Sequence, residues 1–243
     1  MRPLLLSLVL TVVTTMSHGQ VIISLLLGDK LNSGQVEFGL DGGVNYSWQT
    51  GTTYGQALPT FNLGFYFDIK TRNPLWLIHT GVIVKSTMGA NGLPVYSLNN
   101  PDLDNTFANG SIERTLSYFN VPVFAKRKFG SSFYAEGGIM MGLLYQAEDL
   151  FKSGIQGGDA TFTRSIRGDY RALDAGVAAG IGYRLMKGNG MNIGVRAYQG
   201  VVNVLETNPG PSVRNQSLYF TIGIPIGAGK ARERESAKEA EKP

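Results

Sequence analysis

The sequence predicts an all-β protein, an eight-stranded antiparallel up-and-down transmembrane β-barrel with a short N-terminal periplasmic helix. Segments with alternating apolar and polar residues follow one another from about residue 35, and this period is typical of β-strands. The connections between them alternate in length: 47–58, 87–113, 147–168 and 204–214 are long, whereas 70–74, 128–132 and 186–190 are short. No later segment has the 18 uninterrupted apolar residues of a membrane helix, and a closed barrel is the other structure that can span lipid.

The alternation in loop length also predicts an orientation. Long loops at one rim and short turns at the other are typical of outer-membrane barrels, whose long loops face the exterior and whose short turns face the periplasm. The composition agrees with this fold. A chain of 243 residues allows one barrel domain, and 32 glycines with an aromatic share of 10% suit many short strands with tight bends.

The two ends of the chain are predicted to lie outside the barrel. Arg2 precedes a short apolar stretch, and small residues precede a cut before Gln20, which is the pattern of a signal peptide. The apolar residues of 21–31 predict an amphipathic helix beneath the barrel mouth, with a strand or a disordered leader as the alternative. The chain therefore divides into a signal peptide (1–19), a periplasmic leader (20–34), the barrel (35–227) and a charged periplasmic tail (228–243).

Eight segments have the pattern of lipid-facing strands. The clearest begins at Gln35, where the even positions up to Tyr46 are apolar or glycine and the odd positions are polar or small. In the segment that begins at Trp76 both faces are rather apolar, so its two faces are less distinct. Pro122 lacks an N–H for the ladder, which predicts a bulge or a local break there. The segments are 35–46, 60–69, 76–85, 115–127, 133–146, 172–185, 191–203 and 216–226.

The polar faces of these strands carry charges of both signs into the lumen. An eight-stranded barrel has an interior just wide enough for its own side chains, and buried charges must be paired. A packed salt-bridge network is therefore expected, and a general diffusion porin is not. The predicted members are Glu37, Asp41, Asp68, Lys85, Lys126, Glu136, Asp174, Arg184 and Arg196.

Aromatic residues are expected at the two headgroup levels, where amphipathic rings settle. Tyr46, Trp48, Phe61 and Tyr145 are predicted to form the outer girdle, and Trp76, Phe133 and Tyr183 the periplasmic one. A soluble, lipocalin-like barrel would instead turn its apolar face inward around a ligand, and the sequence leaves this inversion open.

Two further groups of residues could carry chemistry. His79 is the one histidine left after the predicted cleavage, and it could act as a general base in a lipid-modifying enzyme; a packed lumen residue is the simpler interpretation. The segment 99–105 could offer oxygen ligands to Ca²⁺, but it lacks the glycine and the distal glutamate of an EF-hand loop. Asx-turn chemistry explains the same residues. We expect no metal site, no cofactor and no catalytic residues.

Three segments resemble the PorT-like outer-membrane β-barrel family of Bacteroidetes. They are the leader 21–33, the aliphatic-Pro-aliphatic strand 119–126 that ends in Lys126, and the strand 174–183, which has the Asp-x-Gly pattern and ends Gly-x-Gly-Tyr. The resemblance implies an eight-stranded up-and-down outer-membrane barrel and brings no catalytic residues. One branch of the family is associated with protein secretion across the outer membrane. The chain departs from common barrel proteins in continuing past Ile226 into a charged tail.

Taken together, these patterns predict an integral, non-enzymatic outer-membrane protein of a Gram-negative bacterium, exported by a cleaved signal peptide. Its role is expected to be structural, surface-interacting or secretion-accessory, and to depend on long extracellular loops. The alternatives are a barrel that binds or transports small solutes or lipids, and an enzyme that uses His79. Expected partners are outer-membrane lipid and lipopolysaccharide, the barrel-assembly machinery, and a secretion system or surface partner. The net charge of +4 is spread along the chain, so no nucleic acid is expected, and we expect a monomer.

Overall fold

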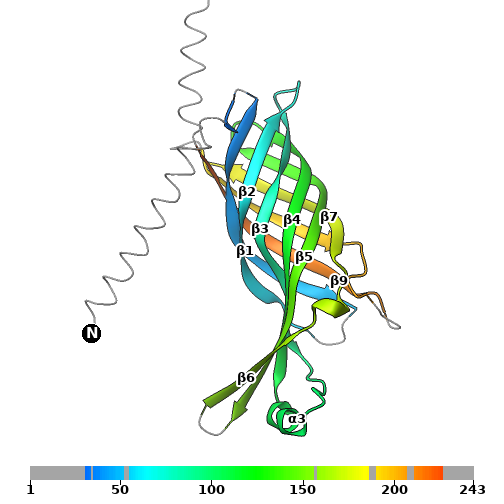
Figure 1. Cartoon of the computed structure of the whole chain (residues 1–243). Helices are drawn as coiled ribbons and strands as arrows, with labels where there is room; N and C mark the ends of the chain where they lie inside the picture. Colours follow the sequence, from blue (N-terminus) through cyan, green and yellow to red (C-terminus); the bar gives the residue numbers. More distant parts are fainter. Residues whose placement is uncertain are drawn as a thin grey trace, which may run out of the picture.

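A computed structural model describes residues 31–33, 35–51, 55–155, 158–185, 190–206 and 211–226. The predicted signal peptide, most of the predicted leader with its helix at 21–31, and the charged tail lie outside these residues. Figure 1 shows a tilted barrel with strand segments and a short helix projecting at one end. No helix within the described ranges is long and apolar enough to cross a membrane.

The described strands are antiparallel, and eight of them close into a ring. Their order is β1-β2-β3-β4-β5-β7-β8-β9, and β9 returns to pair with β1. The predicted eight-stranded antiparallel up-and-down barrel is therefore confirmed, whereas the predicted N-terminal helix is not tested by the described residues. The strands are β1 (Val36–Thr50), β2 (Leu58–Lys70), β3 (Trp76–Leu93), β4 (Ser111–Phe129), β5 (Phe133–Ile155), β6 (Gly158–Ser165), β7 (Leu173–Arg184), β8 (Asn192–Gly200) and β9 (Arg214–Pro225), with α3 (Pro101–Phe107) between β3 and β4 and a 3-10 turn η2 (Arg167–Asp169) after β6.

The apolar face of the ring points outward. Val44 of β1, which lies opposite Phe61 of β2 and Phe220 of β9, is exposed, as are those two rings. The neighbouring inward residues, Asn45 and Ser47, are fully buried. An apolar outer wall with polar side chains inside is typical of a barrel in a membrane. The alternative of a soluble, lipocalin-like barrel with its apolar face inward is therefore wrong.

Several strands are longer than the sequence indicated, because pairing continues beyond the ring. The segments 87–113 and 147–168, predicted as long loops, contain the ends of β3, β4 and β5, the helix α3, and β6. There the partners are strands of the same projection and not lipid, so the strands do not carry the row of exposed apolar residues that marked the ring in the sequence. By contrast, β8 ends at Gly200 rather than at Asn203.

The prediction that Lys85 points into the lumen is wrong. Along β2 and β3 the register shifts between two neighbouring pairs: Gly64 lies opposite Ile83, but Leu63 lies opposite Lys85. The extra residue on β3 is a β-bulge, which reverses the faces of the residues that follow. Lys85 is exposed on the outer wall, with its Nζ 6.0 Å from the centre of the Phe61 ring.

The expected irregularity at Pro122 is present as a local break on one side. Toward β3 the ladder pairs Val123 with Thr80 and resumes at Asn120 with Ile83, so Pro122 has no β3 partner among the described pairs. Toward β5 the register is continuous, and Pro122 lies opposite Met140. A residue without an N–H is thus accommodated in a closed ring by a short gap in the β3–β4 ladder, at Val121 and Pro122.

We predict that Gly43→Ala destabilises the barrel more than Gly42→Ala does. Gly43 has φ +149°, and a Cβ added there would lie 1.9 Å from the backbone oxygen of Phe220, across the closing pair β1–β9. At Gly42 the nearest atom would be 3.3 Å away. The expected loss for Gly43→Ala exceeds ~1 kcal/mol, measured by urea unfolding of the protein in lipid vesicles. Equal stabilities of the two variants would contradict this account of the closing pair.

Candidate functional site

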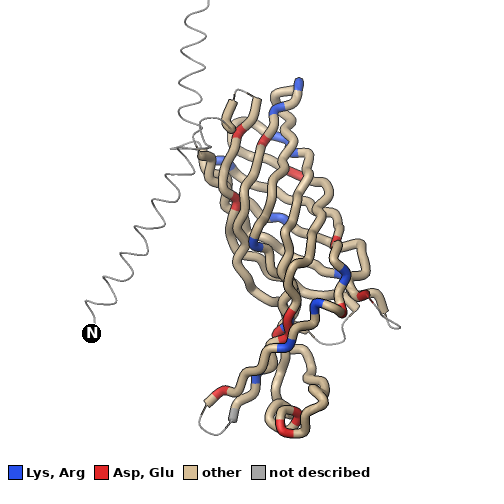
Figure 2. Tube along the Cα trace, in the orientation of Figure 1, with Lys and Arg blue, Asp and Glu red and all other residues tan. Residues whose placement is uncertain are grey.

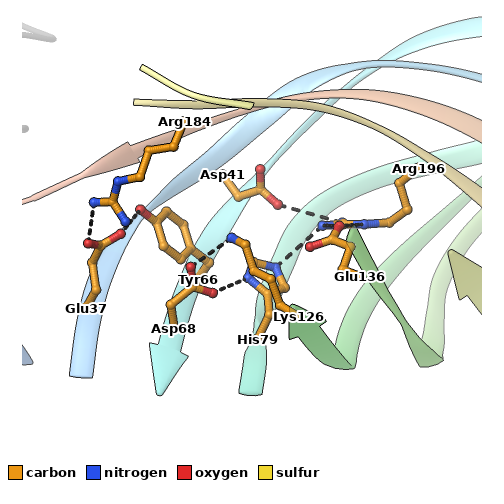
Figure 3. Close-up of polar contacts among 9 residues, drawn as sticks. All are labelled: Glu37, Asp41, Tyr66, Asp68, His79, Lys126, Glu136, Arg184 and Arg196. Atoms are coloured by element: carbon orange, nitrogen blue, oxygen red, sulfur yellow. Dashed lines mark hydrogen bonds and ion pairs between the residues drawn. The ribbon is translucent and has the colours of Figure 1, made fainter. Parts of the chain in front are cut away.

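The lumen near the short turns contains a three-residue ionic cluster on adjacent strands. Asp68 of β2 and His79 of β3 are register partners, and Lys126 of β4 reaches the same carboxylate (Figure 3). Lys126 Nζ donates to Asp68 Oδ2 at 2.8 Å, and Asp68 Oδ1 lies 2.7 Å from His79 Nδ1. All three side chains are buried, so the ammonium compensates the buried carboxylate.

A second ionic cluster lies beside the first and depends on a glycine. Glu136 of β5 and Arg196 of β8 are both register partners of Gly180 on β7, which lies between them. Because Gly180 has no side chain, the two longer side chains meet across it, with Arg196 Nη2 2.7 Å from Glu136 Oε1. Asp41 lies 3.9 Å from Arg196 Nη1. Arg196 Nη2 is also 3.5 Å from His79 Nε2, which joins the two clusters.

A third ion pair closes the lumen toward the short turns. Arg184 Nη2 lies 2.6 Å from Glu37 Oε2, and the Tyr66 hydroxyl donates to Glu37 Oε1 at 3.2 Å (Figure 3). Seven of the nine predicted lumen residues thus form ion pairs inside the barrel. Of the other two, Lys85 lies outside, and Asp174 is buried and accepts a hydrogen bond from Asn215 at 2.9 Å.

His79 belongs to this network, a role the sequence reasoning did not assign to it. Its ring stacks between Tyr66 and Phe124, with centroid distances of 5.7 and 5.9 Å. Its two nitrogens face Asp68 and Arg196, as given above. The one indication of this role in the sequence is the position of His79, which lies opposite Asp68 across the hairpin. Since neither nitrogen faces open space, this geometry gives the hypothesis of a catalytic base no support.

The lumen near the projecting end of the barrel is filled by a mixed apolar core. Tyr118, Met140 and Tyr219 from the barrel wall pack with Tyr170 and Val204, which come from the connections after β6 and β8. All five side chains are buried. The cavity around Asp41, His79 and Arg196 has a volume of about 10 Å³, which leaves space for about one water. This interior offers no path for a solute.

The predicted girdle residues all lie on the outer wall. Six of them are 36–64% exposed, and Tyr183 is half-buried. Near the short turns Phe133 packs edge-on against its register partner Tyr183 at 4.9 Å, and the Arg127 guanidinium lies 5.5 Å from the Trp76 ring centre. Near the long loops Tyr145 packs against Phe119 at 4.6 Å. The rings therefore gather toward both ends, as headgroup-level residues do.

At the other end four strands leave the ring as a small sheet with a core of its own. We call it the projecting sheet: Met88–Leu93 of β3, Ser111–Leu116 of β4, Ala147–Ile155 of β5, and β6 (Figure 1). On one face Phe151 packs against Phe107 of α3, with ring centres 5.8 Å apart, and Ile112 and Leu93 complete the core.

Asn100 caps α3, and Asp104 fixes the loop that precedes it. The Asn100 side chain accepts hydrogen bonds from the N–H groups of Asp102 and Leu103, a helix N-cap. Asp104 accepts from the Ser97 hydroxyl and from Leu98 N, both at 2.6 Å, and these bonds hold the pKa of Asp104 below its usual value. No cluster of three metal-ligating side chains occurs in the described ranges. The Ca²⁺ hypothesis for this loop is therefore unsupported.

The neck between barrel and projecting sheet depends on one buried carboxylate. Asp149 of β5 is fully buried and binds Arg114 of β4 through both oxygens, at 2.7 and 2.6 Å. Arg114 also donates to the Tyr170 hydroxyl, and the Tyr96 hydroxyl donates to Asp149. Burial and the nearby Asp149 raise the pKa of Tyr96 to about 12. Figure 2 shows charged residues of both signs together at this neck.

A family model for an outer membrane protein beta-barrel domain matches residues 29–206. The chain belongs to this family. Its location is therefore the outer membrane, and the outward apolar wall is a lipid-facing surface. No curated protein matches the sequence.

Several solved structures match this chain in a comparison of structures. Ail, the attachment invasion locus protein of Yersinia pestis, is 13% identical, with 79% of this chain and 99% of that chain covered and a TM-score of 0.38. Neisserial surface protein A is 11% identical, with 77% and 96% covered and a TM-score of 0.40. OprG from Pseudomonas aeruginosa is 10% identical, with 80% and 95% covered and a TM-score of 0.36.

We predict that Glu136→Gln costs the barrel much more stability than Glu113→Gln. The first change leaves the buried Arg196 with Asp41 at 3.9 Å as its nearest carboxylate, and breaking a buried ion pair costs about 3–5 kcal/mol. The second breaks a surface pair, in which Lys152 is 44% exposed, and costs about 0–1 kcal/mol. Urea unfolding in lipid vesicles measures both, and similar losses would contradict the assigned network.

Proposed function

We propose that this protein is a non-enzymatic outer-membrane anchor that presents the projecting sheet outside the cell to bind an extended polypeptide segment. The observation that carries this proposal is the edge strand β6. Among the described strands β6 pairs with β5 alone, so its other edge offers unpaired backbone N–H and C=O groups. Such an edge is a template for an added strand.

The sequence of β6 suits this role. It contains no proline, and its residues alternate between two faces. Phe162, the register partner of Phe151, packs on the side of α3, whereas Thr161 and Thr163 are exposed. The edge therefore combines free main-chain groups with a polar outer surface, and it lacks the proline that commonly blocks strand addition.

The filled lumen supports an anchoring role over a transport role. Ionic clusters and an apolar core fill the middle of the barrel, and the cavity around Asp41, His79 and Arg196 has a volume of only about 10 Å³. The loop asymmetry supports an orientation in which the projecting sheet faces the exterior and the short turns face the periplasm. Lipid and lipopolysaccharide would then surround the wall of a monomeric barrel inserted by the barrel-assembly machinery.

We further propose that the chain lies in the PorT-like branch of its family and is exported by a cleaved signal peptide. The motifs of 21–33, 119–126 and 174–183 support this placement. In the second motif, Pro122 lies at the gap in the β3–β4 ladder and Lys126 neutralises Asp68, so both residues have structural roles. A secretion-accessory role would use the same exposed edge to hold an extended substrate.

The edge-strand proposal is tested with a random peptide library displayed on phage and selected against the purified full chain in nonionic detergent. We expect enriched peptides to have alternating β-forming residues. The double variant Thr161→Pro/Thr163→Pro removes two backbone N–H groups from β6. It should bind these peptides at least about tenfold more weakly, a loss of ~1.4 kcal/mol in binding free energy. The matched control Thr161→Val/Thr163→Val keeps the strand and should bind as the parent does. Peptides that bind the proline variant equally well would refute a role of this edge.

A further inference from the structure

The opposite end of the barrel has a pocket that the proposed function does not use. It has a volume of about 200 Å³ and opens at the mouth formed by the short turns. Its lining comes from the ends of β2 to β5, β7 and β8 and from the turn between β4 and β5. The lining residues with polar groups are Asp68, Lys126, Lys128, Ser131, Ser132, Tyr134, Arg184 and Asn192.

The charges around this pocket leave a positive surplus. Three cations line it, and two of them are already paired, Lys126 with Asp68 and Arg184 with Glu37. None of the ion pairs of the described residues involves Lys128. Lys128 is half-buried, so its ammonium is less well hydrated than a surface lysine. An anion in the pocket would supply the missing partner.

The pocket also contains donors suited to an anion with several oxygens. The Lys126 ammonium is buried and gives one of its three protons to Asp68. The Ser131 and Ser132 hydroxyls lie 3.5 Å apart at the turn, and the Asn192 side chain lies on the facing strand. Arginine, lysine and hydroxyl donors together are the groups that bind phosphate oxygens.

We propose that this pocket, the short-turn mouth, binds a phosphate group, carried by an inner-leaflet phospholipid or free in the periplasm. The pocket volume of about 200 Å³ suits a headgroup rather than a whole ligand. Its rim includes Phe133, which is 64% exposed on the lipid-facing wall. This rim places the phosphate where acyl chains can remain in the membrane. That this pocket faces the periplasm rests on the orientation in the proposed function. Its ability to bind an anion rests on its lining residues and is independent of that orientation.

The test uses the full chain extracted from membranes in phosphate-free nonionic detergent. Three probes are titrated by calorimetry: inorganic phosphate, dihexanoylphosphatidylglycerol, and dihexanoylglycerol, which lacks the phosphate. We expect at least one phosphate-bearing probe to bind and the glycerol probe not to bind. Binding of the lipid alone identifies the phospholipid as the source, and binding of inorganic phosphate identifies the free ion.

Lys128→Gln should weaken this binding about tenfold, the loss of one charge-assisted hydrogen bond. Arg72→Gln is the matched control, since it removes the same charge from an exposed turn at the same end, and it should bind as the parent does. Ser132→Ala, a second variant at the turn, should weaken binding more modestly. Heat-modifiable migration in detergent gels checks that each variant is folded. Absence of binding, equal binding of all three probes, or equal weakening by Arg72→Gln would overturn the proposal.

Discussion

The limited width of an eight-stranded ring is the constraint on which the rest of this structure depends. A ring of this size has space for its own side chains and little else. The polar residues that alternation forces inward must therefore satisfy one another without bulk water. Asp68 is shared by Lys126 and His79, and Arg196 is shared by Glu136 and Asp41. The lumen is in effect the core of the protein.

The same constraint explains why glycines are so frequent on the inward faces. Gly180 lets Glu136 and Arg196 meet across a strand, and Gly39 makes space for the Tyr66 ring, since a Cβ there would lie 2.3 Å from it. Large side chains on one strand thus require absent side chains on the next. With the lumen filled in this way, recognition is left to the two ends, the projecting sheet at one and the short-turn mouth at the other.

The sequence was sufficient to predict the ring and most of the lumen, because in a lipid-spanning strand the period of two is imposed on every residue. It failed where a register change or a new partner intervened. The bulge after Ile83 moved Lys85 to the outer wall, and no local sequence pattern predicts that β3 has one extra residue there. The projecting sheet was missed because outside lipid the face opposite the Phe151–Phe162 pair can be polar, as the pair Lys152–Thr161 is, so no lipid-facing apolar row marks these strands. The role of His79 depended on its partner across the hairpin, which only the register supplies.

The most direct test of this account measures whether water reaches the lumen. The chain has no cysteine, so single cysteines can be placed at Ala178, which is 5% exposed inside the barrel, and at Ser131, which is exposed at the short turn. In folded protein in lipid vesicles, a water-soluble maleimide should label Ser131→Cys rapidly and leave Ala178→Cys unlabelled until the barrel is unfolded. Comparable labelling of both cysteines in the folded protein would show an open aqueous lumen and contradict the account.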